Sequence, residues 1–164
     1  MINFAVEVFI VDVHMRFLGN IEAKIDAKGR AFLPAAFRKV LQASGEESLV
    51  MRKDVHQNCL VLYPESVWNR RMDAMLEKIS EWDDEGQQVL RQYVSEAEVL
   101  TLDGNGRFLI QRRYLQMADI VQSIRFIGMN DVIEIWASEK AAAPFMPQQE
   151  FAAKLKAIMT TATT

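Results

Sequence analysis

The sequence predicts an α+β fold built from two copies of one β-rich unit, with helices between the copies and after them. The first observation is an internal repeat: residues 25–34 read IDAKGRAFLP and residues 102–111 read LDGNGRFLIQ, so Asp26 recurs as Asp103. The second observation is that short apolar runs bounded by turn residues accompany each copy, which is typical of strands. The third is a helical spacing of apolar residues between the copies.

In the first unit we expect strands over residues 21–25 and 31–33, joined as a hairpin by a turn that carries Gly29. Glycine suits such a turn because it adopts positive φ at no steric cost. Pro34 then starts a short helix over residues 35–41, which ends near Gly45. Two more strands, residues 49–51 and 59–63, flank a turn at 54–58.

The middle of the chain predicts two helices. The first carries apolar residues at helical spacing on one face, and these are Val67, Met72, Met75, Leu76 and Ile79. The second opens at Asp83 and Asp84, where acidic side chains match the positive end of the helix dipole. Together they form a helical hairpin that links the two units.

The second unit repeats the first. Strands are expected over residues 98–102 and 108–110 around Gly106, then a short helix over 112–117, then strands over 124–127 and 132–136. After Pro144 and Pro147 we expect a last helix over residues 148–159. The Thr-rich end is predicted to be a loose tail.

The expected organisation is therefore an N-terminal extension (1–14), a first unit (20–66), linking helices (67–95), a second unit (97–140) and a C-terminal helix and tail (141–164). Residues 1–14 are rich in apolar residues, but Glu7 and Asp12 interrupt them and no Lys or Arg precedes them. That pattern does not suit a signal peptide or a membrane span. We expect an extra strand or an extension, with Met15 an alternative start, and no association with a membrane.

The sequence has no pattern typical of an active site. Half of the 164 residues are hydrophobic and a quarter are charged, as in an ordinary folded protein. The single Cys59 lies mid-strand and suits a small buried apolar residue, while His14 and His56 are far apart in sequence. There is no Gly-rich phosphate loop or nucleophile elbow, and the acidic residues 81–85 suit a solvated helix start. We expect no catalytic residues, metal, cofactor or small-molecule substrate.

Charge is distributed unevenly along the chain. The formal net charge is −3, yet residues 16–39 hold six Lys and Arg against two Asp and Glu, a net of +4, and residues 73–103 have a net of −7. A basic strand pair can neutralise phosphates or place Arg against guanine in the major groove, which admits a two-stranded ribbon. A solvated basic face is the alternative.

The repeated Asp-x-x-x-Arg spacing also has two interpretations. Asp26 with Arg30, and Asp103 with Arg107, could simply close a turn. We favour a division of roles, in which Asp accepts backbone N–H groups and Arg, with its five donors, contacts DNA.

Beyond these inferences, the chain resembles the MraZ family of bacterial transcriptional regulators over about residues 15–140. The resemblance rests on Arg16-Phe17-Leu18-Gly19, the motif 25–30, Leu33-Pro34, Phe37-Arg38, residues 59–64 with Trp68, the motif 103–107 and residues 133–136. It implies two tandem swapped-hairpin units of the SpoVT/AbrB type, related by a pseudo-twofold axis. It also implies a ring-shaped homo-oligomer in the cytoplasm, associated with the nucleoid. This oligomer would bind short direct repeats in double-stranded DNA upstream of the division and cell-wall gene cluster, including its own promoter.

The resemblance also assigns residues. It implies DNA contacts by Lys28 and Arg30, support from Lys24 and Arg38, and a second contact by Arg107. The turns would be built by Asp26, Gly29, Asp103 and Gly106. The second motif has Asn105 in place of a Lys and Gln111 in place of Pro34, so the first half is expected to dominate. Apolar residues are expected in the core and in subunit contacts: Phe32, Leu33, Phe37 and Phe108.

A different class of function stays open at this point. The chain could be an oligomeric protein-interaction module whose basic edge binds an acidic protein partner. Salt dependence and sequence preference in DNA binding distinguish the two.

Overall fold

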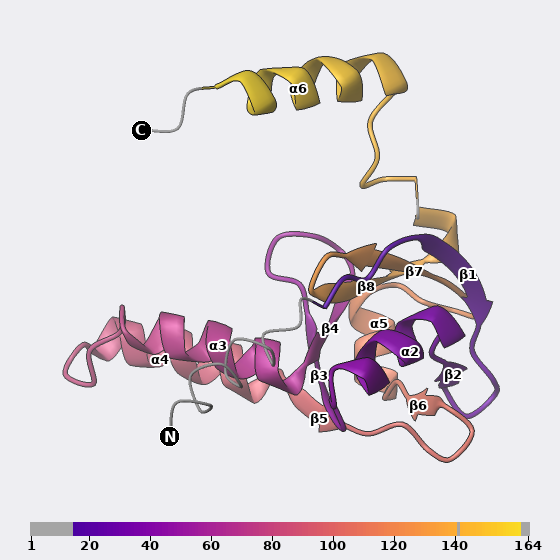
Figure 1. Ribbon diagram of the computed structural model, residues 1–164. Helices are drawn as coiled ribbons and strands as arrows, with labels where there is room; N and C mark the ends of the chain where they lie inside the picture. Colours follow the sequence, from indigo (N-terminus) through magenta and orange to yellow (C-terminus); the bar gives the residue numbers. More distant parts are fainter. Residues whose placement is uncertain (1–14, 141, 162–164) are drawn as a thin grey trace, which may run out of the picture.

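The computed structural model describes residues 15–140 and 142–161 (Figure 1). The expectations for residues 1–14 and for the end of the Thr-rich tail lie outside this part of the chain. The α+β fold is confirmed, with the elements β1 (Asn20–Lys24), β2 (Arg30–Phe32), α2 (Ala35–Ala43), β3 (Leu49–Lys53), β4 (Leu60–Pro64), α3 (Glu65–Leu76), α4 (Asp84–Ser95), β5 (Glu98–Leu100), β6 (Arg107–Leu109), α5 (Arg112–Met117), β7 (Ser123–Met129), β8 (Val132–Ala137), a short 3-10 turn η1 (Ser138–Lys140) and α6 (Gln148–Thr160).

The predicted helices and strands are all present, with ends that differ by a few residues at most. Helix α2 follows Pro34 directly, because proline has the fixed φ of a helix start. Helix α4 begins after Asp83, whose side chain accepts a hydrogen bond from the Glu85 N–H at 3.2 Å.

The first hairpin expected in each unit does not form, whereas β3 with β4 and β7 with β8 pair within their units as expected. Strand β1 does not pair with β2; it pairs antiparallel with β7 of the second unit, from Asn20 opposite Ile127 to Lys24 opposite Ser123. Strand β5 of the second unit in turn pairs with β3 of the first. The six-stranded sheet therefore has the order β1-β7-β8-β4-β3-β5, with strands of both units interleaved (Figure 1).

The remaining two strands form a separate ribbon. Strands β2 and β6 pair antiparallel, with Ala31 opposite Phe108 at the centre. Two more hydrogen bonds extend the ladder at its ends, from Leu33 N to the Gly106 carbonyl at 3.0 Å and from Ile110 N to the Gly29 carbonyl at 2.8 Å. Each turn is thus hydrogen-bonded to the residue that follows the ribbon strand of the other unit. A local turn signal cannot specify this partner, because it fixes only the four or five residues around the turn.

The ribbon and two short helices pack on the sheet to form the larger core. Its buried residues include Leu33, Phe37, Phe108 and Tyr114, together with Leu60, Leu62, Ile124, Phe126, Ile133 and Ile135 of the sheet. Alternate strand residues point to the other face, where Val50, Val61, Tyr63 and Trp136 form a second, smaller cluster with Val67 of α3. The predictions for Leu33, Phe37 and Phe108 as core residues are confirmed, whereas Phe32 is 55% exposed.

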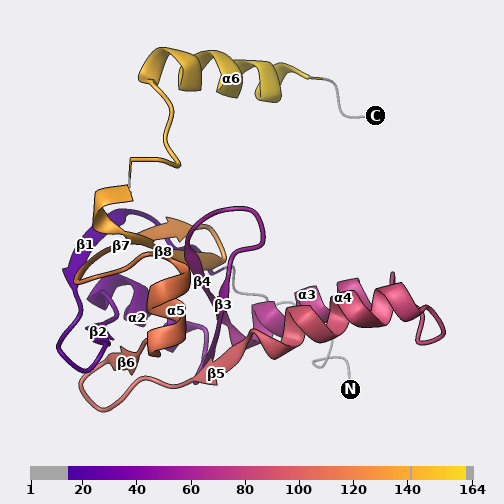
Figure 2. The ribbon, with the colours of Figure 1, turned by 180° about the vertical axis from the view of Figure 1, so that it is seen from behind.

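Helices α3 and α4 form an arm that projects from the sheet (Figures 1 and 2). Arg52 of β3, only 4% exposed, attaches this arm, because its Nε donates to the Tyr93 carbonyl at 3.1 Å and its Nη2 to Glu96 Oε2 at 3.2 Å. Its guanidinium also lies 4.1 Å from the centre of the Tyr93 ring, which stacks on Trp68.

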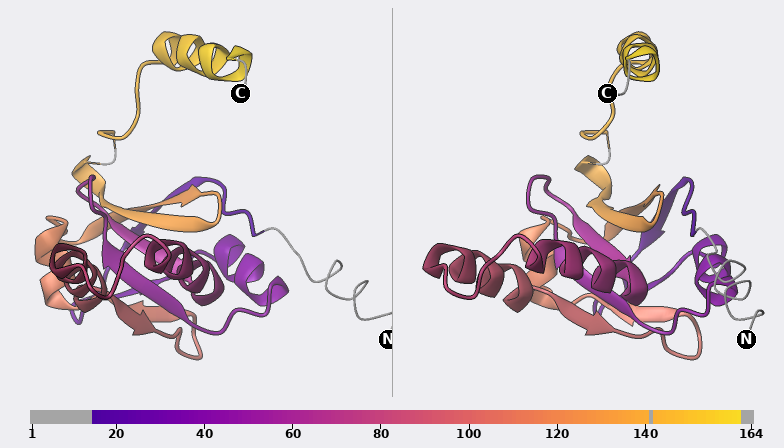
Figure 3. Two further views of the ribbon diagram at one scale, coloured as in Figure 1. Left: turned by 90° about the vertical axis from the view of Figure 1, so that its left-hand side faces the viewer. Right: turned by 60° about the vertical axis from the view of Figure 1, so that its left-hand side comes forward.

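The C-terminal helix α6 stands apart from the sheet in each view (Figure 3). Its exposed side chains include Phe151, Leu155, Ile158 and Met159. Within the described residues, no helix has the length and apolar character that crossing a membrane requires.

Candidate nucleic-acid interface

The first candidate site is the turn before β2. Asp26 Oδ1 accepts the backbone N–H groups of Lys28 and Arg30, each at 2.9 Å, and Oδ2 accepts Arg30 Nε at 2.8 Å. Within the backbone, Asp26 N donates to the Arg30 carbonyl at 2.9 Å, and Gly29 N donates to the Asp26 carbonyl at 3.0 Å. Gly29 has φ +87°, and a Cβ there would lie 2.8 Å from the Ile110 carbonyl oxygen. The turn therefore needs a residue without a side chain at this position.

The turn before β6 has the same construction. Asp103 Oδ1 accepts the N–H groups of Asn105 and Arg107 at 2.9 Å, and Oδ2 accepts Arg107 Nε at 2.9 Å. Gly106 has φ +82° and donates its N–H to the Asp103 carbonyl at 3.0 Å. The repeat in the sequence is thus a repeat in atomic geometry.

Both carboxylates are held in their charged form. The backbone N–H of Arg30 is the main cause that lowers the pKa of Asp26, and the Arg30 guanidinium and the Lys28 N–H add to it. The N–H groups of Arg107 and Asn105 and the Arg107 side chain lower the pKa of Asp103 in the same way. Because a carboxylate would repel phosphate, Asp26 and Asp103 suit the construction of the turns and not contact with DNA.

The two arginines keep donors available. Each uses Nε to bond its Asp, and no terminal guanidinium nitrogen of Arg30 or Arg107 bonds to another described residue. The side chains are 34% and 25% exposed. A guanidinium anchored at Nε presents its outer edge in a fixed orientation, which favours bidentate contact with a guanine or a phosphate.

Both arginines lie on the outward face of the ribbon. Since side chains alternate along a strand, Ala31 and Phe108 face the core, and Arg30, Phe32, Arg107 and Leu109 face away from it. The register places Arg30 opposite Leu109 and Phe32 opposite Arg107. We call these four side chains the ribbon face.

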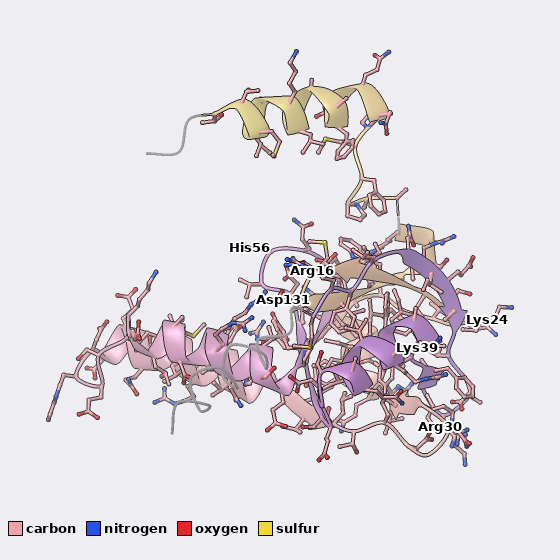
Figure 4. All side chains as sticks on the ribbon, in the orientation of Figure 1. Arg16, Lys24, Arg30, Lys39, His56 and Asp131 are labelled. Atoms are coloured by element: carbon pink, nitrogen blue, oxygen red, sulfur yellow. The ribbon has the colours of Figure 1, made fainter. Side chains whose placement is uncertain are left out.

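The predicted lysines lie in and beside the first turn. Lys28 lies within the turn and Lys24 ends β1, and both are exposed. Figure 4 shows Lys24 and Arg30 on the same side of the molecule, away from the α3–α4 arm. His56 and Asp131 lie nearer to that arm. The acidic segment 73–103 includes much of the arm, so most of its acidic side chains lie away from the first turn.

Arg38 occupies a different setting from the other candidates. It extends from α2 across the second turn, where its guanidinium and Cδ lie against Gly106, and its Nη1 donates to the Leu33 carbonyl at 3.0 Å. The equivalent residue of the other half is Leu115, which packs near Gly29. Arg38 is partly buried, bonded within its own half and packed against the turn of the other half. The sequence repeat does not reveal this cross-unit contact.

The other residues that could take part in catalysis or metal binding do not form a second site in the described part of the chain. Cys59 is fully buried, as predicted, and burial raises the pKa of its thiol, so it stays protonated at neutral pH. His56 lies in the exposed turn after β3. Across residues 15–140 and 142–161, no group of three His, Cys, Asp or Glu side chains could hold a metal ion.

Phe32 and Leu109 are the members of the ribbon face that residue-type reasoning missed. The signal was present in the strand alternation, since Phe32 follows Arg30 by two residues and Leu109 follows Arg107 by two. Phe32 was expected among the core and subunit contacts, and it does not lie in the core of the chain.

Known proteins resemble this chain over most of its length. A family model described as "MraZ protein, putative antitoxin-like" matches residues 16–91. A protein of Phocaeicola vulgatus named transcriptional regulator MraZ is 57% identical over 147 residues, which cover 90% of this chain and 96% of that protein. Proteins of the same name from Bacteroides thetaiotaomicron and Christiangramia forsetii are 56% and 31% identical, covering 88% and 77% of this chain and 93% and 81% of their own lengths.

These relatives define the class of protein, a transcriptional regulator and not an enzyme. The chain belongs to the MraZ family.

Proposed function

We propose that this protein binds specific DNA sequences through the ribbon face and the two turns beside it. The observation that supports the proposal best is the pair of arginines on that face, each held at Nε by an aspartate of its own turn. Anchored donors reach base edges with little loss of side-chain entropy on binding. Lys24 and Lys28 are suited to nearby phosphates, which position a protein without reading its sequence.

The two-stranded form of the ribbon suits DNA recognition. A two-stranded ribbon fits in the major groove, where an Arg can donate to guanine O6 and N7. The antiparallel pairing relates Arg30 and Arg107 by a pseudo-twofold axis through the Ala31–Phe108 pair. The second turn carries Asn105 where the first carries Lys28, so the first half supplies more of the phosphate contacts.

The proposed regulator acts as a ring-shaped homo-oligomer on short direct repeats. One ribbon face covers only a few base pairs, so a single subunit would bind weakly. Linked subunits on neighbouring repeats raise the apparent affinity about a hundredfold or more. Following the family resemblance, the proposed targets lie upstream of the division and cell-wall gene cluster and at the protein's own promoter. The protein would then associate with the nucleoid.

The test is a titration of the full chain against the duplex upstream of its own gene, with a shuffled duplex as control, at several salt concentrations. We expect tight binding to the upstream duplex, weak binding to the shuffled one, and a fall of affinity with salt that reports the phosphate contacts. Equal, weak binding to both duplexes would contradict the proposal. It would favour the alternative, an interaction module whose basic edge binds an acidic protein.

A further inference from the structure

Two large apolar side chains are exposed on the ribbon face, each directly opposite one of the arginines. Phe32 is 55% exposed and Leu109 is 47% exposed. They occupy equivalent positions of the two repeats, since each lies two residues after the arginine of its turn. Exposure at both equivalent positions indicates a shared role and not a local irregularity.

These side chains are not required by the core. Within the same strands, Ala31 and Phe108 point inward and are 1% and 2% exposed. The next residue after each strand, Leu33 and Ile110, is also buried. The core is thus filled without Phe32 or Leu109, and both are available for contact with a partner.

The surroundings of Phe32 and Leu109 indicate what that partner is. Arg107 lies opposite Phe32, with its guanidinium carbon 5.8 Å from the ring centre, and Arg30 lies opposite Leu109. An apolar group beside a guanidinium on each strand matches the major groove, where guanine offers two acceptors and thymine offers the C5 methyl group. No other base carries such an apolar group in that groove.

The spacing of residues along a strand also matches the spacing of base pairs in DNA. Residues two apart on one strand are separated by about 6.6 Å, which is close to two base-pair steps of about 3.4 Å. An arginine and the apolar residue that follows it can therefore face bases two steps apart. Because β2 and β6 run antiparallel, the step from Arg107 to Leu109 points in the opposite direction to the step from Arg30 to Phe32.

We infer that Phe32 and Leu109 are specificity-determining residues that contact the C5 methyl groups of thymines beside the guanines contacted by Arg30 and Arg107. This inference rests on the proposed function. It adds the chemical feature that the protein reads, a thymine methyl group, and the two residues that read it.

The experiment replaces every thymine of the upstream duplex by deoxyuridine, which pairs identically and lacks only the methyl group. We expect the affinity of the wild-type protein to fall by about fourfold for each methyl group that it touches in the normal duplex, since burying one methylene-sized group corresponds to about that factor. The variant Phe32→Ser should bind the normal duplex more weakly and respond less to the replacement. Val55→Ser is the control, because Val55 is 63% exposed and adjoins His56, which Figure 4 shows on a different side of the molecule from Arg30.

The outcomes separate this inference from the proposed function. Equal affinity of the wild-type protein for both duplexes, with discrimination against shuffled DNA retained, would overturn the inference and leave the proposed function standing. Absence of binding to any duplex would overturn both. A change in the oligomer mass of Phe32→Ser in light scattering would place Phe32 in a subunit contact and would also overturn the inference.

Discussion

Phe32 and Arg107 are cross-strand partners, with the arginine's guanidinium carbon 5.8 Å from the centre of the phenylalanine ring. One residue comes from each half of the chain. The ribbon face therefore exists only when both halves fold together, because β2 and β6 pair with each other and with no other strand of the described residues. Stability of the interleaved fold and presentation of the candidate DNA contacts are consequently coupled.

The first prediction concerns the glycine of the first turn. Gly29→Ala should lower the free energy of unfolding by about 1–3 kcal/mol, because an alanine at positive φ is strained and its Cβ would lie 2.8 Å from the Ile110 carbonyl oxygen. Urea denaturation measures the change. Gly104→Ala is the matched control, since a methyl group there would meet nothing within 4 Å. Equal effects of the two substitutions would contradict this account of the turn.

The second prediction concerns the attachment of the α3–α4 arm. Arg52→Ala should destabilise the protein by about 2–3 kcal/mol, because it removes the bonds to Tyr93 and Glu96 and leaves their acceptors unpaired. The value lies below that for a fully buried ion pair because the Glu96 side chain is 37% exposed. Arg91→Ala, an exposed change on α4, should stay within about 0.5 kcal/mol of the wild type. A neutral Arg52→Ala would show that the arm is held by other contacts.

The third prediction concerns pH. The pKa values of Asp26 and Asp103 are lower in the folded chain than in the unfolded one, so their stabilising contribution is present above the ordinary aspartate pKa of about 3.9 and is lost as pH falls through the lowered values. The double variant Asp26→Asn/Asp103→Asn should therefore be less stable than the wild type from pH 5 to 7, and the difference should shrink near pH 3. Asp73→Asn, an exposed change on α3, provides the control. A difference that persists unchanged at pH 3 would assign the effect to something other than charge.

The fourth prediction exchanges the residues that distinguish the two turns. Lys28→Asn should weaken binding to upstream and shuffled DNA alike. It should also make the negative slope of log affinity against log salt less steep by about one. Asn105→Lys should make that slope steeper by a similar amount if the second turn also lies near a phosphate. Fluorescence anisotropy at several salt concentrations measures both. An unchanged slope for Lys28→Asn would remove Lys28 from the interface.

The helices and strands could be predicted because their signals are local. Pro34 and Asp83 mark helix starts, and Gly29 and Gly106 mark turns, through physics confined to a few residues. The pairs β3–β4 and β7–β8 were also predictable, because a short turn joins the two strands of each pair. The partners of β1 and β2 were not, since these strands complete their hydrogen bonds with β7 and β6 of the second unit. Such pairing depends on packing between segments far apart in sequence.

Local features of the candidate site could likewise be predicted, whereas its contacts between the two units could not. The Asp-x-x-x-Arg repeat indicates which residues build the turns, because one carboxylate can accept two nearby N–H groups and the Nε of the following arginine. The position of Arg38 over Gly106 was not predictable, since it arises where α2 of one unit crosses the turn of the other. The DNA-contacting roles of Lys24, Lys28, Arg30, Arg38 and Arg107 stay predictions.

The most direct test of the central claim compares the wild type with the double variant Arg30→Ala/Arg107→Ala on the duplex upstream of the gene and on its shuffled control. Circular dichroism and light scattering first establish that the variant keeps its fold and its oligomer mass. We predict a loss of about 1–3 kcal/mol of binding free energy for each arginine that contacts a base, and with it the loss of preference for the upstream duplex. If the double variant kept the affinity and the preference of the wild type, the ribbon face would not be the DNA-binding surface.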